Sequence, residues 1–133
     1  MAYSLRFWAI LGALCLQTTL VWGAGQKDPI LVIIQAESSG KPMAVGDSGN
    51  SRGICQLSRA TWERLSKYPW SDAFDEEKNV QVAGKRIEEI KRKYNTSETA
   101  YICYRYNCGD NTKLSFGDWK KRNKNKAYRS TYE

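Results

Sequence analysis

The 133-residue chain contains no histidine, and this absence excludes several classes of enzyme. Serine and cysteine hydrolases of the usual kind need an imidazole as general base, and zinc amidases and peptidases bind their metal through imidazole. We therefore expect no metal and no cofactor, and any acid–base chemistry must be carried out by carboxyl groups. A carboxylic acid that is shielded from water is the usual catalyst for cleavage of a glycosidic bond.

Long apolar runs are also scarce, because the chain has only one and it lies at the N-terminus. Arg6 precedes the mainly apolar residues 7–22, and small residues follow at positions 23–25. This order predicts a secretory signal over residues 1–24 that is cleaved at the small residues. An uncleaved membrane anchor is the alternative, but the run is short for one. We expect residues 25–133 to be exported, to the periplasm or the medium, and to meet a membrane only through the signal.

Acidic residues are outnumbered, with 14 Asp and Glu against 21 Lys and Arg and a formal net charge of +7. The signal carries only Arg6, so the exported domain keeps a charge of +6. Such a domain attracts anionic cell-wall polymers, and we expect no nucleic-acid partner. Basic residues are concentrated between positions 113 and 129, among aromatic residues. We interpret this run as a solvated helix face with buried aromatics; a clamp for an anionic wall polymer is the alternative.

Hydrophobic spacing and capping residues predict one mainly α domain without repeats. Asp28 and Pro29 are typical of a helix start, and the helix that they open is apolar nearly all round, which predicts a central position. The segment 45–53 is rich in turn-forming residues and predicts a tight loop or a small β-hairpin. Helices are expected over residues 29–37, 58–65, 75–94, 97–107 and 119–132.

Glu37 lies at the end of this most apolar helix, with the turn-rich segment following it. Burial and the negative end of the helix dipole both disfavour a carboxylate there, and no Lys or Arg precedes it on the helix. Its pKa is therefore expected to be raised, to about 6 as in other glycosidase acids. The alternative is that Glu37 emerges into solvent at the helix end.

Three segments resemble, in the right order, the motifs of the catalytic domain of soluble lytic transglycosylases, a branch of the lysozyme-like fold. Residues 33–45 begin with Ile-Ile-Gln-Ala-Glu-Ser-Ser-Gly and are similar to the opening motif. Residues 51–57 read Ser-Arg-Gly-Ile-Cys-Gln-Leu, where the family usually has Ala-Arg-Gly-Leu-Met-Gln-Leu. Residues 106–109 read Tyr-Asn-Cys-Gly in place of Tyr-Asn-Ala-Gly. The two cysteines are departures that affect the shape of the site.

The resemblance implies a role for several residues of these motifs. Glu37 would be the catalytic acid and base, and Gln56 would hydrogen-bond sugar acetamides or the backbone. Tyr106 would close the site beside the glutamate, and Asn107 would hold its end of the helix in place. The alternatives are an exposed polar Gln56, a core aromatic at Tyr106 and an ordinary helix cap at Asn107.

The implied substrate is the glycan strand of peptidoglycan, cleaved at the β-1,4 bond between N-acetylmuramic acid and N-acetylglucosamine. We expect the domain to be a monomer. One carboxyl group suffices if the C6 hydroxyl of the muramic residue attacks and a 1,6-anhydro sugar forms. A hydrolytic muramidase would need a further group, and Asp47 is the nearby candidate. We favour Asp47 as a turn-forming residue beside the substrate. A non-catalytic peptidoglycan-binding module is the third alternative.

Cysteine is also scarce, with four residues in the chain. Cys15 belongs to the predicted signal, which leaves an odd number in the domain. If a bridge forms, we expect it to join Cys55 to either Cys103 or Cys108.

Overall fold

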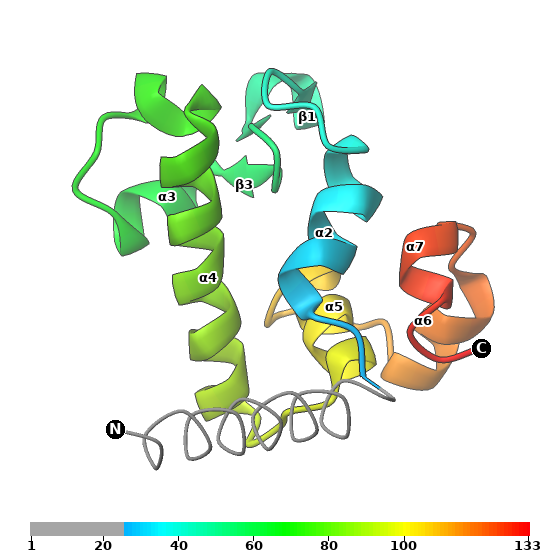
Figure 1. The fold of residues 1–133 in the computed structure, drawn as a ribbon. Helices are drawn as coiled ribbons and strands as arrows, with labels where there is room; N and C mark the ends of the chain where they lie inside the picture. The colour runs from blue at the N-terminus through cyan, green and yellow to red at the C-terminus, as the bar shows by residue number, and fades with distance from the viewer. Residues whose placement is uncertain (1–25) are drawn as a thin grey trace, which may run out of the picture.

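Six helices and a small antiparallel sheet make up residues 26–133, the part of the chain that the computed structural model describes (Figure 1). The predicted mainly α class is confirmed. None of the helices in this part is long and apolar enough to cross a membrane. The predicted signal, with Cys15, lies outside the described residues. The helices are α2 (Pro29–Ser38), α3 (Arg59–Leu65), α4 (Glu76–Lys93), α5 (Thr99–Cys108), α6 (Phe116–Arg122) and α7 (Lys126–Arg129).

Helix α2 starts where the sequence predicts, because the Asp28 side chain accepts a hydrogen bond from the N–H of Ile30 at 3.1 Å. Pro29 occupies the first turn, where its missing N–H is not needed. The helix lies between α4 and α7 in Figure 1 and packs against α4, α5 and α7. Ile33 is fully buried, but Leu31 is 65% exposed, so α2 is not surrounded on all sides as its apolar sequence suggested.

The turn-rich segment forms the predicted hairpin and continues into a third strand. Strands β1 (Val45–Gly46), β2 (Ser51–Arg52) and β3 (Leu57–Ser58) pair antiparallel in that order, with Val45 opposite Arg52 and Ser51 opposite Ser58. The 3₁₀ turn η1 (Asp47–Gly49) joins the first two strands. In Figure 1 this sheet lies between the end of α2 and the helix pair α3 and α4.

Helix α4 holds the segment between β2 and β3 through one buried side chain. Asn79 is fully buried and its Oδ1 accepts the N–H of Cys55 at 2.9 Å. Its Nδ2 donates to the carbonyl oxygens of Arg52 at 3.0 Å and of Ala73, in the 3₁₀ turn η2 (Trp70–Phe74), at 2.8 Å. Gly53 passes so close that a Cβ there would lie 2.3 Å from the Ala73 oxygen.

The single helix predicted over residues 119–132 is wrong, because the chain there forms α6 and α7 with a break between them. Asn125 causes the break: its Oδ1 accepts the N–H groups of Ala127 and Tyr128 and so caps a new helix. Its Nδ2 donates to the carbonyl oxygen of Ala36 in α2 at 3.0 Å. Trp119 and Tyr128 are buried, as expected for the aromatics of this run.

No bridge joins Cys55 to either of its two candidate partners, and Cys55, Cys103 and Cys108 are all free thiols. Cys55 and Cys103 are fully buried in the hydrophobic core. Burial raises the pKa of each of these two thiols to about 12, so they remain protonated and act as small core side chains.

The close approach at Gly53 leads to a test of stability with a matched control. Gly53 has φ +87°, so Gly53→Ala brings both backbone strain and a clash with the fixed Ala73 carbonyl. We expect it to lower the free energy of unfolding by about 3 kcal/mol or more. Gly84→Ala, in the middle of α4 with open space around it, should instead be neutral or stabilising by up to about 1 kcal/mol. Urea unfolding measures both; equal effects would contradict this account.

Candidate active site

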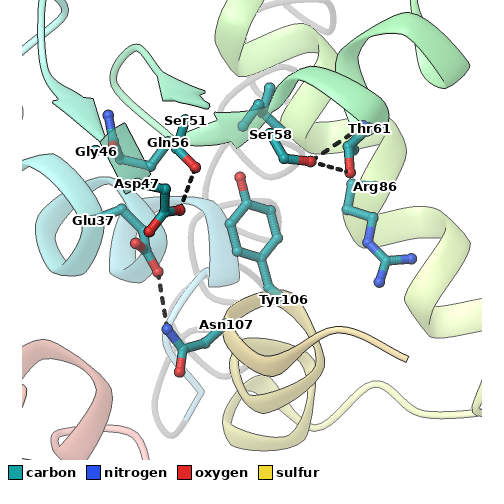
Figure 2. A pocket seen from close by; sticks show the side chains of 11 residues that line it. Glu37, Gly46, Asp47, Ser51, Gln56, Ser58, Thr61, Arg86, Tyr106 and Asn107 are labelled. Carbon is teal, nitrogen blue, oxygen red and sulfur yellow. Dashed lines mark hydrogen bonds between the residues drawn. The ribbon is translucent and has the colours of Figure 1, made fainter. Parts of the chain in front are cut away.

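A cleft of about 330 Å³ lies where α2, the sheet, α4 and α5 meet (Figure 2). All five site residues predicted from the sequence line it, although they come from three separate parts of the chain. They are Glu37, Asp47, Gln56, Tyr106 and Asn107. Ser51, Ser58, Thr61 and Arg86 also contribute to its wall.

Glu37 stands in the last turn of α2, and one of its oxygens is held from the far end of the chain. Its Oε1 accepts a hydrogen bond from the hydroxyl of Tyr128 in α7, and Asn107 Nδ2 lies 3.5 Å from the same oxygen (Figure 2 shows the Asn107 contact). Trp119 Nε1 donates to Asn107 Oδ1 at 3.0 Å, which turns the amide nitrogen toward Glu37. No described residue donates a hydrogen bond to Glu37 Oε2.

The environment of Glu37 raises the pKa of its carboxyl group, as the sequence predicts. Burial is the largest cause, and the hydrogen bonds from Tyr128 and Asn107 oppose it by favouring the carboxylate. The negative charge of Asp47 raises the pKa further. A raised pKa keeps part of the population protonated toward neutral pH, which is what a general acid requires.

Ser38, the residue after the glutamate, fixes the end of α2 to the segment between β2 and β3. Its hydroxyl lies 2.6 Å from the carbonyl oxygen of Ile54 and donates to it. The hydroxyl of Tyr106 in α5 donates to the neighbouring carbonyl of Cys55 at 2.7 Å. Tyr106 therefore stands inside the cleft as expected (Figure 2), and it also positions the wall opposite α5.

Gln56 is a positioning residue for the sheet. Its Nε2 donates to the carbonyl oxygens of Ala44 at 2.9 Å and Gly53 at 3.0 Å, which selects the backbone among the partners expected for it. A Cβ at Gly46 would lie 2.4 Å from Gln56 Oε1, so a larger residue there would require the Gln56 side chain to shift. The predicted alternative of an exposed polar side chain is therefore wrong.

Asp47 and Asn107 both do more than their local sequence suggests. Asp47 is turn-forming, with φ +50°, and its Oδ2 accepts the hydroxyl of Ser51 at 2.6 Å while the residue faces the cleft. Asn107 is not the cap of α5, because Gly109 is the C-cap of that helix. Its amide links α5 to Trp119 of α6 and approaches Glu37.

Sequence reasoning missed Tyr128 as a site residue and counted it only among the aromatics of the basic run. It stands 91 residues after Glu37, so no spacing rule relates the two positions. Burial and the charge of Glu37 raise the pKa of Tyr128, which therefore stays a neutral donor. Within residues 26–133, no group of three or more His, Cys, Asp or Glu side chains is arranged to hold a metal ion.

A helical domain with a small sheet and a shielded glutamate beside it has the features of a lysozyme-like glycosidase. The family model "Transglycosylase SLT domain" matches residues 23–131, and the chain belongs to this family. Its members are peptidoglycan lytic transglycosylases, so the predicted enzyme class and the predicted peptidoglycan substrate are confirmed. No curated protein and no solved structure matches the chain.

The contact between Tyr128 and Glu37 leads to a prediction about pH. Tyr128→Phe removes a hydrogen bond that favours the carboxylate, so the pKa of Glu37 should rise further and activity should persist to higher pH. A ¹³C NMR titration of the Glu37 carboxyl measures the shift. Tyr132→Phe is the matched control, because its hydroxyl bonds the Lys120 carbonyl at 3.1 Å in the same tail. A Glu37 pKa that falls in Tyr128→Phe would contradict the assignment.

Proposed function

We propose that Glu37 cleaves the β-1,4 bond between N-acetylmuramic acid and N-acetylglucosamine by non-hydrolytic transglycosylation. The observation that carries this proposal is the state of the Glu37 carboxyl group, which has a raised pKa and lies in a cleft. Its Oε1 accepts hydrogen bonds from Tyr128 and Asn107, and its Oε2 accepts none from the described residues. Because Oε1 accepts hydrogen bonds, the acid proton belongs on Oε2. This oxygen would deliver the proton to the substrate.

In the first step Glu37 Oε2 transfers its proton to the glycosidic oxygen, and the bond from that oxygen to C1 of the muramic residue breaks. The aglycone leaves as an alcohol and an oxocarbenium-like centre forms at C1. Glu37 becomes a carboxylate at this moment. The hydrogen bonds from Tyr128 and Asn107 strengthen with the charge, so they stabilise the group when it has lost its proton.

In the second step the same Glu37 carboxylate takes the proton of the C6 hydroxyl of the muramic residue. The C6 oxygen bonds to C1, the 1,6-anhydro ring closes, and Glu37 is again an acid. No water enters the products. The nucleophile is already attached to the substrate, so the site needs no second group to place it.

The surroundings of Asp47 support this reaction over hydrolysis. Asp47 is exposed in a tight turn, and one of its oxygens is already paired with the Ser51 hydroxyl. A base that activates water is held more firmly as a rule, on rigid elements. The raised pKa of the Glu37 carboxyl group also argues against a non-catalytic module that only binds peptidoglycan.

Glu37→Gln tests the role of the acid. The amide keeps the acceptor for Tyr128 but cannot supply a proton, so glycan cleavage should fall by about 10²- to 10⁴-fold while folding and substrate binding persist. Purified peptidoglycan sacculi are digested, and the released muropeptides are analysed by mass spectrometry. Wild-type protein should leave mainly 1,6-anhydro-muramic ends.

Asp47→Asn is the control, with an expected loss below about tenfold because it keeps the turn and the shape of the side chain. Chiefly reducing ends, together with an Asp47→Asn loss as large as that of Glu37→Gln, would instead identify a two-carboxylate muramidase. Activity of Glu37→Gln above a tenth of wild type would remove Glu37 from its role.

We also propose that the domain is exported and is held near its substrate by anionic polymers of the wall. A second hollow lies on α6 and α7, away from the catalytic cleft, and is lined mainly by cations. The lining residues are Lys120, Lys121, Arg122, Asn123, Lys124, Arg129 and Glu133. Five positive charges against one negative charge favour an anionic polymer there.

Binding to sacculi should therefore weaken as salt rises. We expect a loss of about tenfold between roughly 50 and 500 mM NaCl, because bound counterions are released and the charges are screened. Removing two charges with Lys121→Gln and Lys124→Gln should flatten this dependence. The matched pair Lys67→Gln and Arg92→Gln removes two exposed charges elsewhere and should retain more of it. Cosedimentation measures all three proteins; salt-independent binding of the wild type would overturn the proposal.

A further inference from the structure

The end of the cleft that lies beyond Tyr106 from Glu37 has a different chemistry. Figure 2 shows Tyr106 between the Glu37 side and a group formed by Ser58, Thr61 and Arg86. Arg86 comes from α4, and its side chain is only 9% exposed while it lines the cleft. A cation so deeply placed has to be stabilised by partners, and the proposed acid chemistry gives it no role.

Two carboxylates hold the Arg86 guanidinium in place. Nη1 lies 2.7 Å from Glu89 Oε2, and Nη2 lies 3.2 Å from Asp110 Oδ1. Tyr94 also donates its hydroxyl to Asp110 Oδ1, at 2.5 Å. These contacts orient the planar group and leave further N–H groups of its five without a partner among them.

Both of these carboxylates are shared with a second cation, so the network is not neutral. Arg64 bonds Glu89, and Lys93 Nζ lies 3.2 Å from Asp110 Oδ2. Three positive groups, including Arg86, therefore face two negative groups, which leaves one positive charge in excess. This positive charge acts inside the cleft, because Arg86 and Tyr106 both line it. Burial raises the pKa of the Tyr106 hydroxyl, and the charge of Arg86 acts in the opposite direction.

A hydroxyl that lines the same cleft is also available to a ligand. Ser58 Oγ accepts the N–H of Thr61 at 3.2 Å and donates to Thr61 Oγ1 at 3.0 Å (Figure 2). The Thr61 hydroxyl hydrogen is therefore left to donate elsewhere. A fixed guanidinium and a free hydroxyl donor in the wall of one cleft are suitable partners for a carboxylate.

We infer that Arg86 and Thr61 form a subsite that binds a carboxylate of the muramyl residue. This inference rests on the proposed function in taking the glycan strand as the ligand of the cleft. The carboxylate has two possible sources, the lactyl group of a muramic residue that lacks its peptide, or the peptide stem. Arg86 is then a specificity-determining residue that anchors the substrate at the end of the cleft remote from the acid.

Binding tests this inference without cleavage, in a Glu37→Gln background. Three soluble glycan oligomers are compared by calorimetry: one with peptide stems, one with the stems removed by an amidase, and one with stems whose carboxyl groups are amidated. Arg86→Gln should weaken binding by about tenfold or more for a ligand that carries the recognised carboxylate. It should change binding of the amidated ligand less than about twofold, since the lost contact is with a charge. Loss with the first ligand identifies the stem, and loss confined to the second identifies the lactyl group.

Arg64→Gln is the matched control, because it removes a positive charge from the same network but does not line the cleft. It should change binding of all three ligands less than about twofold, since exposed pairs contribute little. Thr61→Val leaves the ion network intact and should weaken the same charged ligand by about three- to tenfold. If Arg86→Gln does not fold, the binding of Thr61→Val to the charged ligand tests the subsite instead.

Arg86 would be shown to be only structural if Arg86→Gln weakened binding of the charged and the amidated ligands equally. The same conclusion would follow if Thr61→Val caused no loss and Arg64→Gln and Arg86→Gln had equal effects. A wild-type protein that produces anhydro ends while these variants bind normally would overturn the inference alone. A wild-type protein that binds the oligomers but produces no anhydro ends would overturn the proposed reaction and leave the subsite standing.

Discussion

The active site depends on one constraint: the backbone of segment 52–56 is held in place by side chains from three helices. Ser38 of α2, Asn79 of α4 and Tyr106 of α5 each reach a backbone group of this segment. Backbone groups buried without such partners would cost free energy, so each hydrogen bond both stabilises the segment and sets its position. The position of the cleft wall that faces Glu37 is therefore set by these three helices.

The carboxyl group of Glu37 costs stability in exchange for its chemistry. Its folded-state pKa lies above the ordinary glutamate value of 4.5, so the folded protein binds this proton more tightly than the unfolded chain. This effect lowers stability as pH rises from the unfolded pKa through the folded pKa, and the full cost applies above both values. The hydrogen bonds from Tyr128 and Asn107 reduce this cost, and Tyr128 comes from a C-terminal helix that packs against α2.

Helix α4 combines structural and chemical roles on one face. Asn79 and Arg86 are seven residues apart, a spacing that places both on the same side of a helix, together with the buried Val82 and Ile90. One side chain holds the backbone of the cleft and the other places a cation in its wall. The two ends of the cleft therefore differ in charge, which suits a substrate with neutral sugars and attached carboxylates.

By itself, the sequence determined the mainly α class, the start of α2 and the turn-rich nature of residues 45–53, because these follow from local caps, turns and hydrophobic spacing. For Glu37 it predicted a raised pKa, with exposure to solvent as the alternative, and for 45–53 it left a loop or a hairpin open. The ordered motifs also located Gln56, Tyr106 and Asn107. Only the tertiary structure decided that Tyr128 bonds Glu37 and that Arg86 faces the cleft. The break between α6 and α7 likewise depends on Asn125, which caps α7 and also bonds the Ala36 carbonyl of α2. Such contacts join residues far apart in the chain, and their geometry exists only after the helices have packed.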